Sequence, residues 1–281
     1  VNDQLIGQFG VGFYSAFMVS ERVEVLSKKH GAKSASKWIS DGQSGYSITD
    51  GERDDTGTCI ILHLRKEAKE YLEQERITHL VKKYSDHIAQ PIFFVGKNDE
   101  AEQLNSSAAL WTRPAKDISK DEYTSFYHGV ASAYDTPFVT LHNKTEGAVE
   151  FTNLLFIPST APFDLYDPER KSKLHLYVNR VFITDDYDGL VPKWLRFLRG
   201  IIDTPDVDLN VSREMLQQNP AVTKINKAVV KRVLSELKKG LEKKRNEYAA
   251  FWNGLGKVIK EGLYEDQANS EKLLEICLFQ S

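Results

Sequence analysis

The chain has 281 residues, 41% of them hydrophobic and 27% charged, and its net charge is −3. This composition predicts a globular protein with a core, folded as one large domain or two modest ones. The acidic balance argues against a nucleic-acid-binding domain, which has a basic surface, and no apolar run approaches the roughly 20 residues that cross a bilayer. Cys59 and Cys277 lie far apart in the sequence, which fits a reducing compartment better than a disulfide framework.

The first 95 residues predict a small sheet with short helices before and after it. Gly7, Gly10 and Gly12 form a turn that leads into an apolar helical stretch over 13–19. Alternation of apolar and polar residues then predicts strands over 22–27, 37–40, 46–49 and 58–64. Because glycine- or aspartate-rich joints separate these strands, we expect an antiparallel meander. Apolar residues at helical spacing over 77–88 predict a helix that ends before Pro91, with a strand over 92–95.

The later residues predict mixed elements followed by helices. Ser119 and Glu122 have the spacing of a capping box and predict a helix that runs to about Ser132. Strands are predicted over 137–143, 149–157 and 174–183. A short helix is predicted over 193–201, with Trp194 and Phe197 in the core. We then expect an extended segment over 206–211, a helical turn over 213–218 and a long amphipathic helix over 222–241.

The order of these elements indicates an α+β protein in two units. We place the first unit in residues 1–95 and the second in residues 111–281, mixed to about residue 219 and mainly helical after it. The polar, aperiodic segment 96–110 is the predicted linker. Because the sequence begins with Val1 and shows no signal peptide, we expect a piece excised from a longer protein.

The first candidate site is the glycine-rich string IGQFGVGFYS over residues 6–15. Glycines let a backbone approach a ligand closely, and free N–H groups at a helix start can cradle phosphate oxygens. The spacing G-x-x-G-x-G is neither that of a dinucleotide-binding fold nor that of a P-loop. On spacing alone, a tight packing turn is the simpler interpretation.

The second candidate is Arg213, in the string LNVSREMLQQ over residues 209–218. Taken alone, an arginine on a helical turn is most simply a solvated surface residue. Phosphoryl transfer, however, needs positive charge against the γ-phosphate oxygens, and a planar, always charged guanidinium supplies it well. An arginine supplied by a second domain would make hydrolysis wait for domain docking.

Both strings resemble the heat-shock protein 90 family, and the resemblance extends over nearly the whole chain. Residues 6–15 resemble the stretch that closes the family's ATP lid, and Gly57 with Thr58 resembles its Gly-Thr pair. Residues 209–218 resemble the catalytic loop of the family's middle domain. The strings LWTR at 110–113, APFDL at 161–165, LYVNRVFI at 176–183 and PKWLRF at 192–197 also resemble this domain. Segment 96–109 lacks the long charged run of eukaryotic cytosolic members, which indicates a bacterial or organellar form.

The resemblance implies the C-terminal part of a GHKL-type α/β sandwich ATPase domain, followed by the family's middle domain of α/β layers and helices. It implies backbone contacts to the nucleotide phosphates from Gly7, Gln8, Gly10, Val11, Gly12 and Phe13. Thr58 would reach the adenine, Arg213 would contact the γ-phosphate, and Gln217 would help hold the catalytic loop in its active position. Trp111 would contact client proteins, although a core position is an equally open interpretation of this tryptophan.

The same resemblance implies an ATP-dependent chaperone that uses ATP with Mg²⁺. The family's general-base Glu, its adenine-reading Asp and the Asn that helps hold Mg²⁺ precede the glycine string. We therefore expect this chain alone to be inactive as an ATPase and to hold no metal ligand. Expected partners are unfolded or partly folded client proteins, cochaperones, and a second copy joined through a C-terminal domain beyond Ser281. Nucleic acid and membranes are not expected partners, and the expected location is the bacterial cytoplasm or else an organellar matrix.

Two other functions stay open on the sequence. The chain could be a non-catalytic client or cochaperone platform, against which the presence of Arg213 and Gln217 argues. The same ATP-binding fold also serves type II topoisomerases and mismatch-repair ATPases, which act on DNA. The acidic balance and the string SRE at 212–214 argue against that kinship. The basic residues of the long helix could guide acidic clients, although a solvated helix face is the simpler interpretation.

Overall fold

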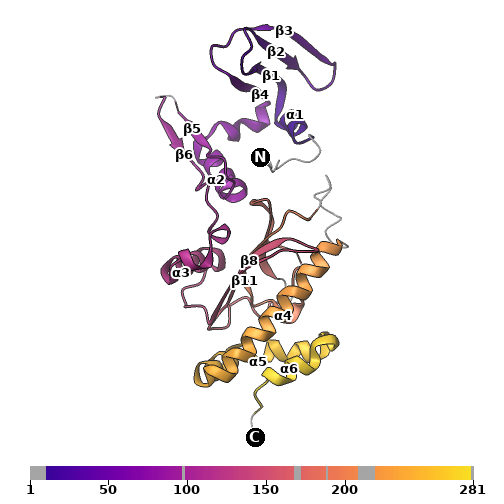
Figure 1. The fold of residues 1–281 in the computed structure, drawn as a ribbon. Helices are drawn as coiled ribbons and strands as arrows, with labels where there is room; N and C mark the ends of the chain where they lie inside the picture. Colours follow the sequence, from indigo (N-terminus) through magenta and orange to yellow (C-terminus); the bar gives the residue numbers. More distant parts are fainter. Residues whose placement is uncertain (1–10, 97–98, 168–171, 188, 208–218, 280–281) are drawn as a thin grey trace. The chain divides into compact units, whose positions relative to one another are not determined.

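The computed structural model describes residues 11–96, 99–167, 172–187, 189–207 and 219–279, and the chain is α+β as predicted. It divides into two compact units, one formed by residues 1–82 and 94–104 and the other by residues 83–93 and 105–281 (Figure 1). Each unit contains a sheet of its own.

The first unit contains a four-stranded antiparallel sheet with the order β3-β2-β1-β4. Its strands are β1 (Ser20–Lys28), β2 (Ala35–Ser40), β3 (Tyr46–Gly51) and β4 (Gly57–Leu64). The predicted meander is confirmed for β1 to β3, but it is wrong for β4, which pairs with β1. The alternation of apolar and polar residues sets the face on which a side chain lies, but not which strand is the neighbour. The sequence pattern therefore could not show that β4 pairs with β1.

The two faces of this sheet differ in chemistry, because residues paired across strands share a face. One face carries the cross-strand row Ile48, Trp38, Val25 and Ile60, and we call it the Trp38 face. Two short helices, η1 (Gly12–Ser15) and α1 (Ala16–Val19), come directly before β1 in the chain. The Trp38 ring lies 5.8 Å from that of Phe13 and 6.5 Å from that of Phe17, so these two short helices pack on the Trp38 face.

The opposite face of the sheet carries an ionic cluster around Glu24. The Glu24 carboxylate lies 2.7 Å from Lys37 Nζ, 2.8 Å from His63 Nε2 and 3.1 Å from an Arg22 guanidinium nitrogen. Hydrogen bonds from Lys37 and His63 hold the pKa of Glu24 below its ordinary value. The same face also carries apolar side chains, because Ile39 and Ile61 are the cross-strand partners of Glu24.

A hairpin occupies part of the segment where the sequence predicts a linker. After η2 (Lys66–Leu72) and α2 (Gln74–Ser85), β5 (Phe93–Val95) pairs with β6 (Ala101–Gln103). Asn105 follows and is 3% exposed. Its side chain donates to the carbonyls of Ser85 and Gln90 and accepts from the Ile92 N–H, at 2.8 to 3.2 Å. The chain therefore passes between its two units at 82/83, 93/94 and 104/105, where the sequence placed one linker over 96–110.

The second unit is built on a five-stranded sheet with the order β10-β9-β11-β8-β7. Its strands are β7 (Val139–Thr145), β8 (Phe151–Ile157), β9 (Lys173–Val178), β10 (Val181–Thr184) and β11 (Arg199–Asp203). β11 runs parallel to β9, and the other neighbours are antiparallel. The last strand of the described residues thus enters the middle of the sheet.

Two predicted elements of this unit differ from the structure, the first by a missed turn and the second in type. The single strand predicted over 174–183 is the β9–β10 hairpin, because Asn179 and Arg180 take positive φ values of 50° and 65° and close a two-residue turn. The helix predicted over 193–201 is only the short η5 (Lys193–Leu195), and β11 begins at Arg199. Trp194 and Phe197 are nevertheless fully buried, as predicted.

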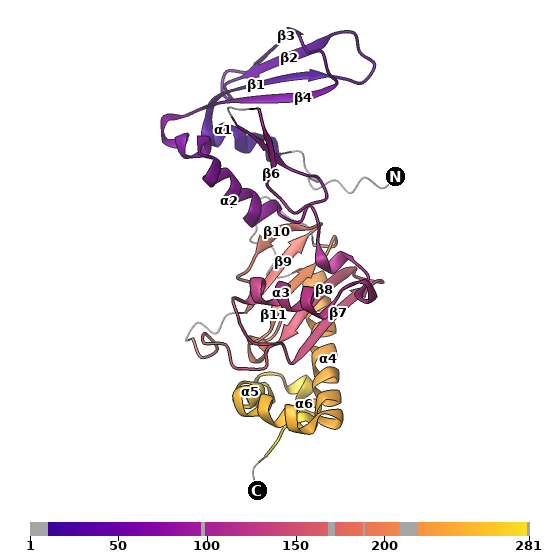
Figure 2. The same ribbon diagram turned by 90° about the vertical axis from the view of Figure 1, so that its left-hand side faces the viewer.

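Helices cover both faces of the five-stranded sheet (Figures 1 and 2). On one face lie η3 (Leu110–Thr112), η4 (Ala115–Asp117) and α3 (Lys120–Ala131), whose Trp111 and Tyr127 pack with Phe156 and Ile201 of the sheet. α4 (Pro220–Lys243) crosses the other face, and α5 (Arg245–Glu265), η7 (Gln267–Asn269) and α6 (Ser270–Ile276) lie beyond one end of the sheet and pack with α4 around the larger core. β11 contributes Ile201 to one face and Ile202 to the other.

The helix boundaries of this unit follow from local signals in the sequence. The predicted capping box is confirmed: the Glu122 N–H donates to Ser119 Oγ, and the Glu122 carboxylate accepts from the Ser119 N–H. These bonds and Arg113 lower the pKa of Glu122 to about 2. Asn219 caps α4 by accepting from the Ala221 N–H at 2.8 Å, and the long amphipathic helix is confirmed. The helical turn predicted over 213–218 lies outside the described residues.

The Asp135 carboxylate ties the loop after α3 to the loop after β8. One oxygen accepts from the Tyr127 hydroxyl at 2.7 Å, and the other accepts from the N–H and hydroxyl groups of Ser159 and Thr160, at 2.9 to 3.2 Å. Burial alone would raise the pKa of Asp135, but the hydrogen bonds from Tyr127, Ser159 and Thr160 outweigh it and lower the pKa.

We predict that Asp135→Asn lowers the free energy of unfolding at pH 7 by about 2 kcal/mol, because an amide replaces a carboxylate that accepts charge-assisted bonds. The pKa of Asp135 is lower in the folded chain, so its contribution is full above the unfolded value of about 4 and is lost as pH falls through the folded value. Urea titrations at pH 7 and pH 3 would show the difference between the two proteins shrinking. Asp121→Asn, on the exposed first turn of α3, is the control, and an equal effect there would contradict the prediction.

Candidate functional site

The described residues include five of the predicted site positions. Val11, Gly12, Phe13 and Thr58 belong to the first unit, and Trp111 belongs to the second. The remaining predicted positions lie outside the described residues: Gly7, Gln8, Gly10, Arg213 and Gln217. The phosphate-binding and catalytic-loop predictions that rest on them stay predictions.

The end of the glycine string enters a short helical turn. The Val11 carbonyl accepts from the Tyr14 N–H at 3.0 Å, and the Ser15 hydroxyl donates to the Gly12 carbonyl at 2.7 Å. A Cβ built on Gly12 would meet no described atom within 4 Å. Packing among the described residues therefore does not require a glycine here, and no described atom would block a ligand at the Cβ position of Gly12.

Phe13 anchors this turn to the sheet through its ring. The ring lies edge-on to both Phe17 and Trp38, with centroids 6.2 Å and 5.8 Å away, and 38% of the residue is exposed. The side chain is thus held by the Trp38 face. Only the backbone of Phe13 remains available for the phosphate contact that the sequence predicts.

Thr58 lies at the start of β4 and points to the same face of the sheet as Trp38. It is paired with Ser27, and Val25 of the same strand is paired with Trp38 and Ile60, so these positions share one face. The Thr58 Oγ1 atom lies 2.9 Å from Ser27 Oγ, and Thr58 is exposed. The structure therefore brings Phe13 and Thr58, which are far apart in the sequence, to one face of the same sheet.

The loop that delivers Thr58 is held by Lys28 and Gly57. Lys28 Nζ donates to the carbonyls of Arg53 and Asp54, each at 3.1 Å. Gly57 takes a φ of 135°, which a residue with a side chain rarely adopts. Sequence reasoning missed Ser27 and Lys28. The period-two alternation places Ser27 on the same face as Val25 and could have found it.

The Trp38 face remains largely uncovered by the described residues. Tyr46, Ile48, Ile60 and Leu62 lie on it and are 70%, 63%, 51% and 39% exposed. Apolar side chains on both sides of Trp38 give the face the mostly apolar lining that ligand sites have, with Thr58 as a polar group at its border.

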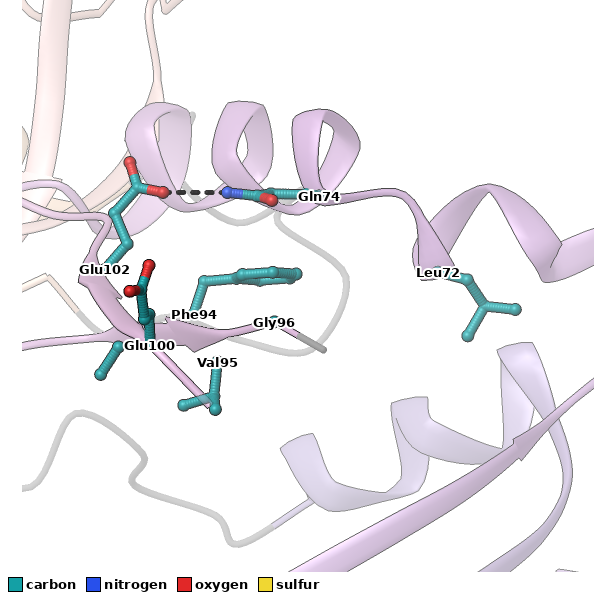
Figure 3. Close-up of a pocket in the computed structure, with 8 residues that line it drawn as sticks. Leu72, Gln74, Phe94, Val95, Gly96, Glu100 and Glu102 are labelled. Atoms are coloured by element: carbon teal, nitrogen blue, oxygen red, sulfur yellow. Dashed lines mark hydrogen bonds between the residues drawn. The ribbon is translucent and has the colours of Figure 1, made fainter. Parts of the chain in front are cut away.

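A separate cavity in the first unit has the wrong chemistry for phosphate (Figure 3). It has a volume of about 980 Å³ and lies between the β5–β6 hairpin and the start of α2. Its described lining consists of Leu72, Gln74, Phe94, Val95, Gly96, Glu100, Ala101 and Glu102. Glu102 accepts a hydrogen bond from Gln74 at 2.9 Å, and neither lysine nor arginine is among these lining residues. Two carboxylates would repel a nucleotide's phosphates, so we exclude this cavity as the nucleotide site.

Trp111 occupies a core position in the second unit. It is 1% exposed, and its indole N–H donates to Asp203 Oδ2 at 2.8 Å. Its ring packs on those of His87 and Tyr177, with centroids 4.7 Å and 4.9 Å away. Burial raises the pKa of Asp203, against the hydrogen bonds that it accepts. The predicted client contact stays a prediction, and it would require Trp111 to leave this packing.

The basic face of α4 is partly paired with acidic neighbours. Lys238 lies 2.7 Å from Glu275, and Lys239 and Arg232 lie 2.8 Å and 3.5 Å from Glu236. Exposed pairs of this kind contribute little to stability and suit a solvated helix face.

No group of three metal-ligating side chains that could hold an ion occurs in the described part of the chain. Within the same residues, every helix is too short or too polar to cross a membrane.

Comparison with known proteins gives one family. The model of the family described as Hsp90 protein matches residues 95–281. "Chaperone protein HtpG" of Roseobacter denitrificans is 54% identical over 277 residues, which are 99% of this chain and 44% of that protein. The proteins of the same name from Orientia tsutsugamushi and Rickettsia rickettsii are each 51% identical over all of this chain and 45% of their own length. The chain thus spans less than half of the curated relatives that it matches.

We predict that Trp111→Phe lowers the free energy of unfolding by about 2 kcal/mol, because Asp203 loses a buried hydrogen-bond donor. Trp111→Ala should cost roughly 3–5 kcal/mol through the cavity that it leaves. Urea denaturation of the chain measures both. Tyr134→Ala, at an aromatic residue that is 97% exposed, is the control and should change stability by less than about 0.5 kcal/mol. A Trp111→Phe protein as stable as the control would mean that this indole is a surface group.

Proposed function

Because the chain belongs to the heat-shock protein 90 family, we propose that it is part of an ATP-dependent chaperone. In this proposal, ATP binding and hydrolysis drive a conformational cycle that remodels unfolded or partly folded proteins. The supporting relatives are chaperones by name, and this chain aligns with them over 99% or more of its length. Because it spans less than half of theirs, the ATPase activity is proposed for the longer protein.

The observation that carries the nucleotide part of the proposal is the shared Trp38 face. Phe13 of the glycine string and Thr58, which the family resemblance assigns to adenine, both lie on it. No described atom lies within 4 Å of a Cβ added to Gly12, and the apolar side chains of the face suit the planar base. We propose that the phosphates lie at the glycine string and the adenine at Thr58, within a GHKL-type domain of which this chain supplies one part.

Hydrolysis would use ATP with Mg²⁺, which neutralises charge on the phosphate oxygens. The family resemblance places the Asn that helps hold Mg²⁺ before the glycine string, so in this proposal its ligand comes from another part of the longer protein. Arg213 would place its guanidinium against the γ-phosphate and stabilise charge as it spreads over the oxygens. Gln217 would hold the loop that carries Arg213. The chain alone would bind nucleotide poorly and hydrolyse none.

We further propose that the partners are unfolded or partly folded clients, cochaperones and a second copy of the protein. The bacterial cytoplasm is the proposed location, since the relatives with 50% identity or more named above are bacterial proteins. Trp111 remains a proposed client contact only if the core around Asp203 opens.

We predict that Arg213→Ala in the longer protein lowers the rate of ATP hydrolysis ~10³-fold while ATP affinity changes little, because the arginine acts mainly on the transition state. Steady-state hydrolysis and equilibrium nucleotide binding measure the two quantities. Gln217→Ala should lower hydrolysis less, since it acts through the loop. Arg232→Ala, on the exposed face of α4, removes an equal charge and should have no effect. Unchanged hydrolysis in Arg213→Ala would instead favour a non-catalytic platform for clients or cochaperones.

A further inference from the structure

Thr58 is the last member of a polar row that crosses the whole four-stranded sheet. The register pairs Asp50 with Ser36, Ser36 with Ser27, and Ser27 with Thr58, so all four side chains lie on the Trp38 face. The neighbouring row contains Ile48, Trp38, Val25 and Ile60 and is apolar. A base lying on the apolar row would meet the polar row along one border only.

Within the polar row, Thr58 has one hydrogen-bonded side-chain neighbour among the described residues. Its Oγ1 atom lies 2.9 Å from Ser27 Oγ, and either hydroxyl can be the donor. If Ser27 donates, Thr58 keeps its proton and one lone pair for a ligand; if Thr58 donates, it keeps both lone pairs. In both cases the bond restrains the rotation of Thr58 about χ1 and leaves its hydroxyl able to bond to a ligand.

This restraint matters because Thr58 lies on an edge strand of the sheet that the described residues form, and is exposed among them. A threonine has restricted but still multiple χ1 states on a strand, and water competes for its hydroxyl there. A hydrogen bond between two exposed hydroxyls is weak in water. It becomes stronger when a ligand covers it and lowers the local dielectric constant.

We propose that Ser27 is a positioning residue for nucleotide recognition and acts through Thr58. Its hydroxyl holds the Thr58 side chain in the rotamer that meets the base, so the ligand does not have to order that side chain on binding. Lys28 and Gly57 hold the backbone of the loop that leads to Thr58, and Ser27 holds the Thr58 side chain. This inference rests on the proposed function and adds to it a residue that touches no nucleotide.

The first arm of the test observes Thr58 directly in the longer protein. Threonine-methyl NMR without nucleotide reports the χ1 population of Thr58 through the chemical shift of its methyl group. Ser27→Ala should move this signal toward an averaged position, and Ser27→Thr, which keeps a hydroxyl, should restore it. Ser36→Ala is the matched control, because Ser36 lies beside Ser27 in the same row and makes no described hydrogen bond to Thr58. An unchanged Thr58 signal in Ser27→Ala would overturn the proposal.

The second arm measures ATP affinity in the same proteins by calorimetry. Ser27→Ala should weaken binding roughly 3- to 10-fold, the range expected for one neutral hydrogen bond, and Ser36→Ala should not. In a Thr58→Val background, Ser27→Ala should not weaken ATP binding further, because Ser27 acts through the Thr58 hydroxyl, which valine lacks. An equal loss in both backgrounds would show a merely structural role and overturn the proposal. Absence of ATP binding in the unmodified protein would overturn the proposed function as well, whereas tight binding retained in Ser27→Ala would overturn the role of Ser27 alone.

Discussion

The second unit depends on the insertion of β11 into the middle of its sheet. This strand reaches both cores, with Ile201 on the α3 side and Ile202 on the α4 side. A Cβ on Gly200 would collide with the Leu154 carbonyl of β8, so only glycine allows the two backbones to approach this closely. At its ends, Arg199 bonds to Asp164 at 2.6 Å and Asp203 accepts from Trp111. One strand thus fixes the sheet, both helical layers and the buried indole.

That dependence explains which parts of the fold the sequence could predict. Local signals were sufficient for α3, whose capping box is visible as Ser119 and Glu122, and for α4, whose apolar positions recur over many turns. The β9–β10 turn was missed although Asn179 and Arg180 interrupt the apolar run, because Asn-Arg is not one of the usual turn pairs, such as Asn-Gly or Asp-Gly. β11 was missed because Trp194 and Phe197 are spaced as on a helix, while their burial comes from tertiary packing. The return of β4 to β1 was missed because strand order is a long-range property.

The candidate site shows the same division between local and long-range information. The glycine string and Thr58 were found through family resemblance, because neither Gly12 nor a single threonine is distinctive by spacing. Only the register of β1 with β4 shows that Thr58 shares the Trp38 face and has Ser27 beside it. Trp111 illustrates the opposite case: sequence leaves both a core and a surface position open, and its bond to Asp203 shows how the core position is satisfied. The sequence pattern identifies candidate site residues, and strand pairing decides which of their side chains lie next to each other.

The chain passes between its units at three places, and Asn105 secures the last of these crossings through Ser85, Gln90 and Ile92. Each unit is therefore assembled from separate stretches of sequence. A single genetic crossover anywhere in 83–104 would divide at least one unit between two parents. Chimaeras of related proteins should therefore exchange both sequence stretches of a unit together. For the same reason, natural recombination between related genes should rarely separate the two units within residues 83–104.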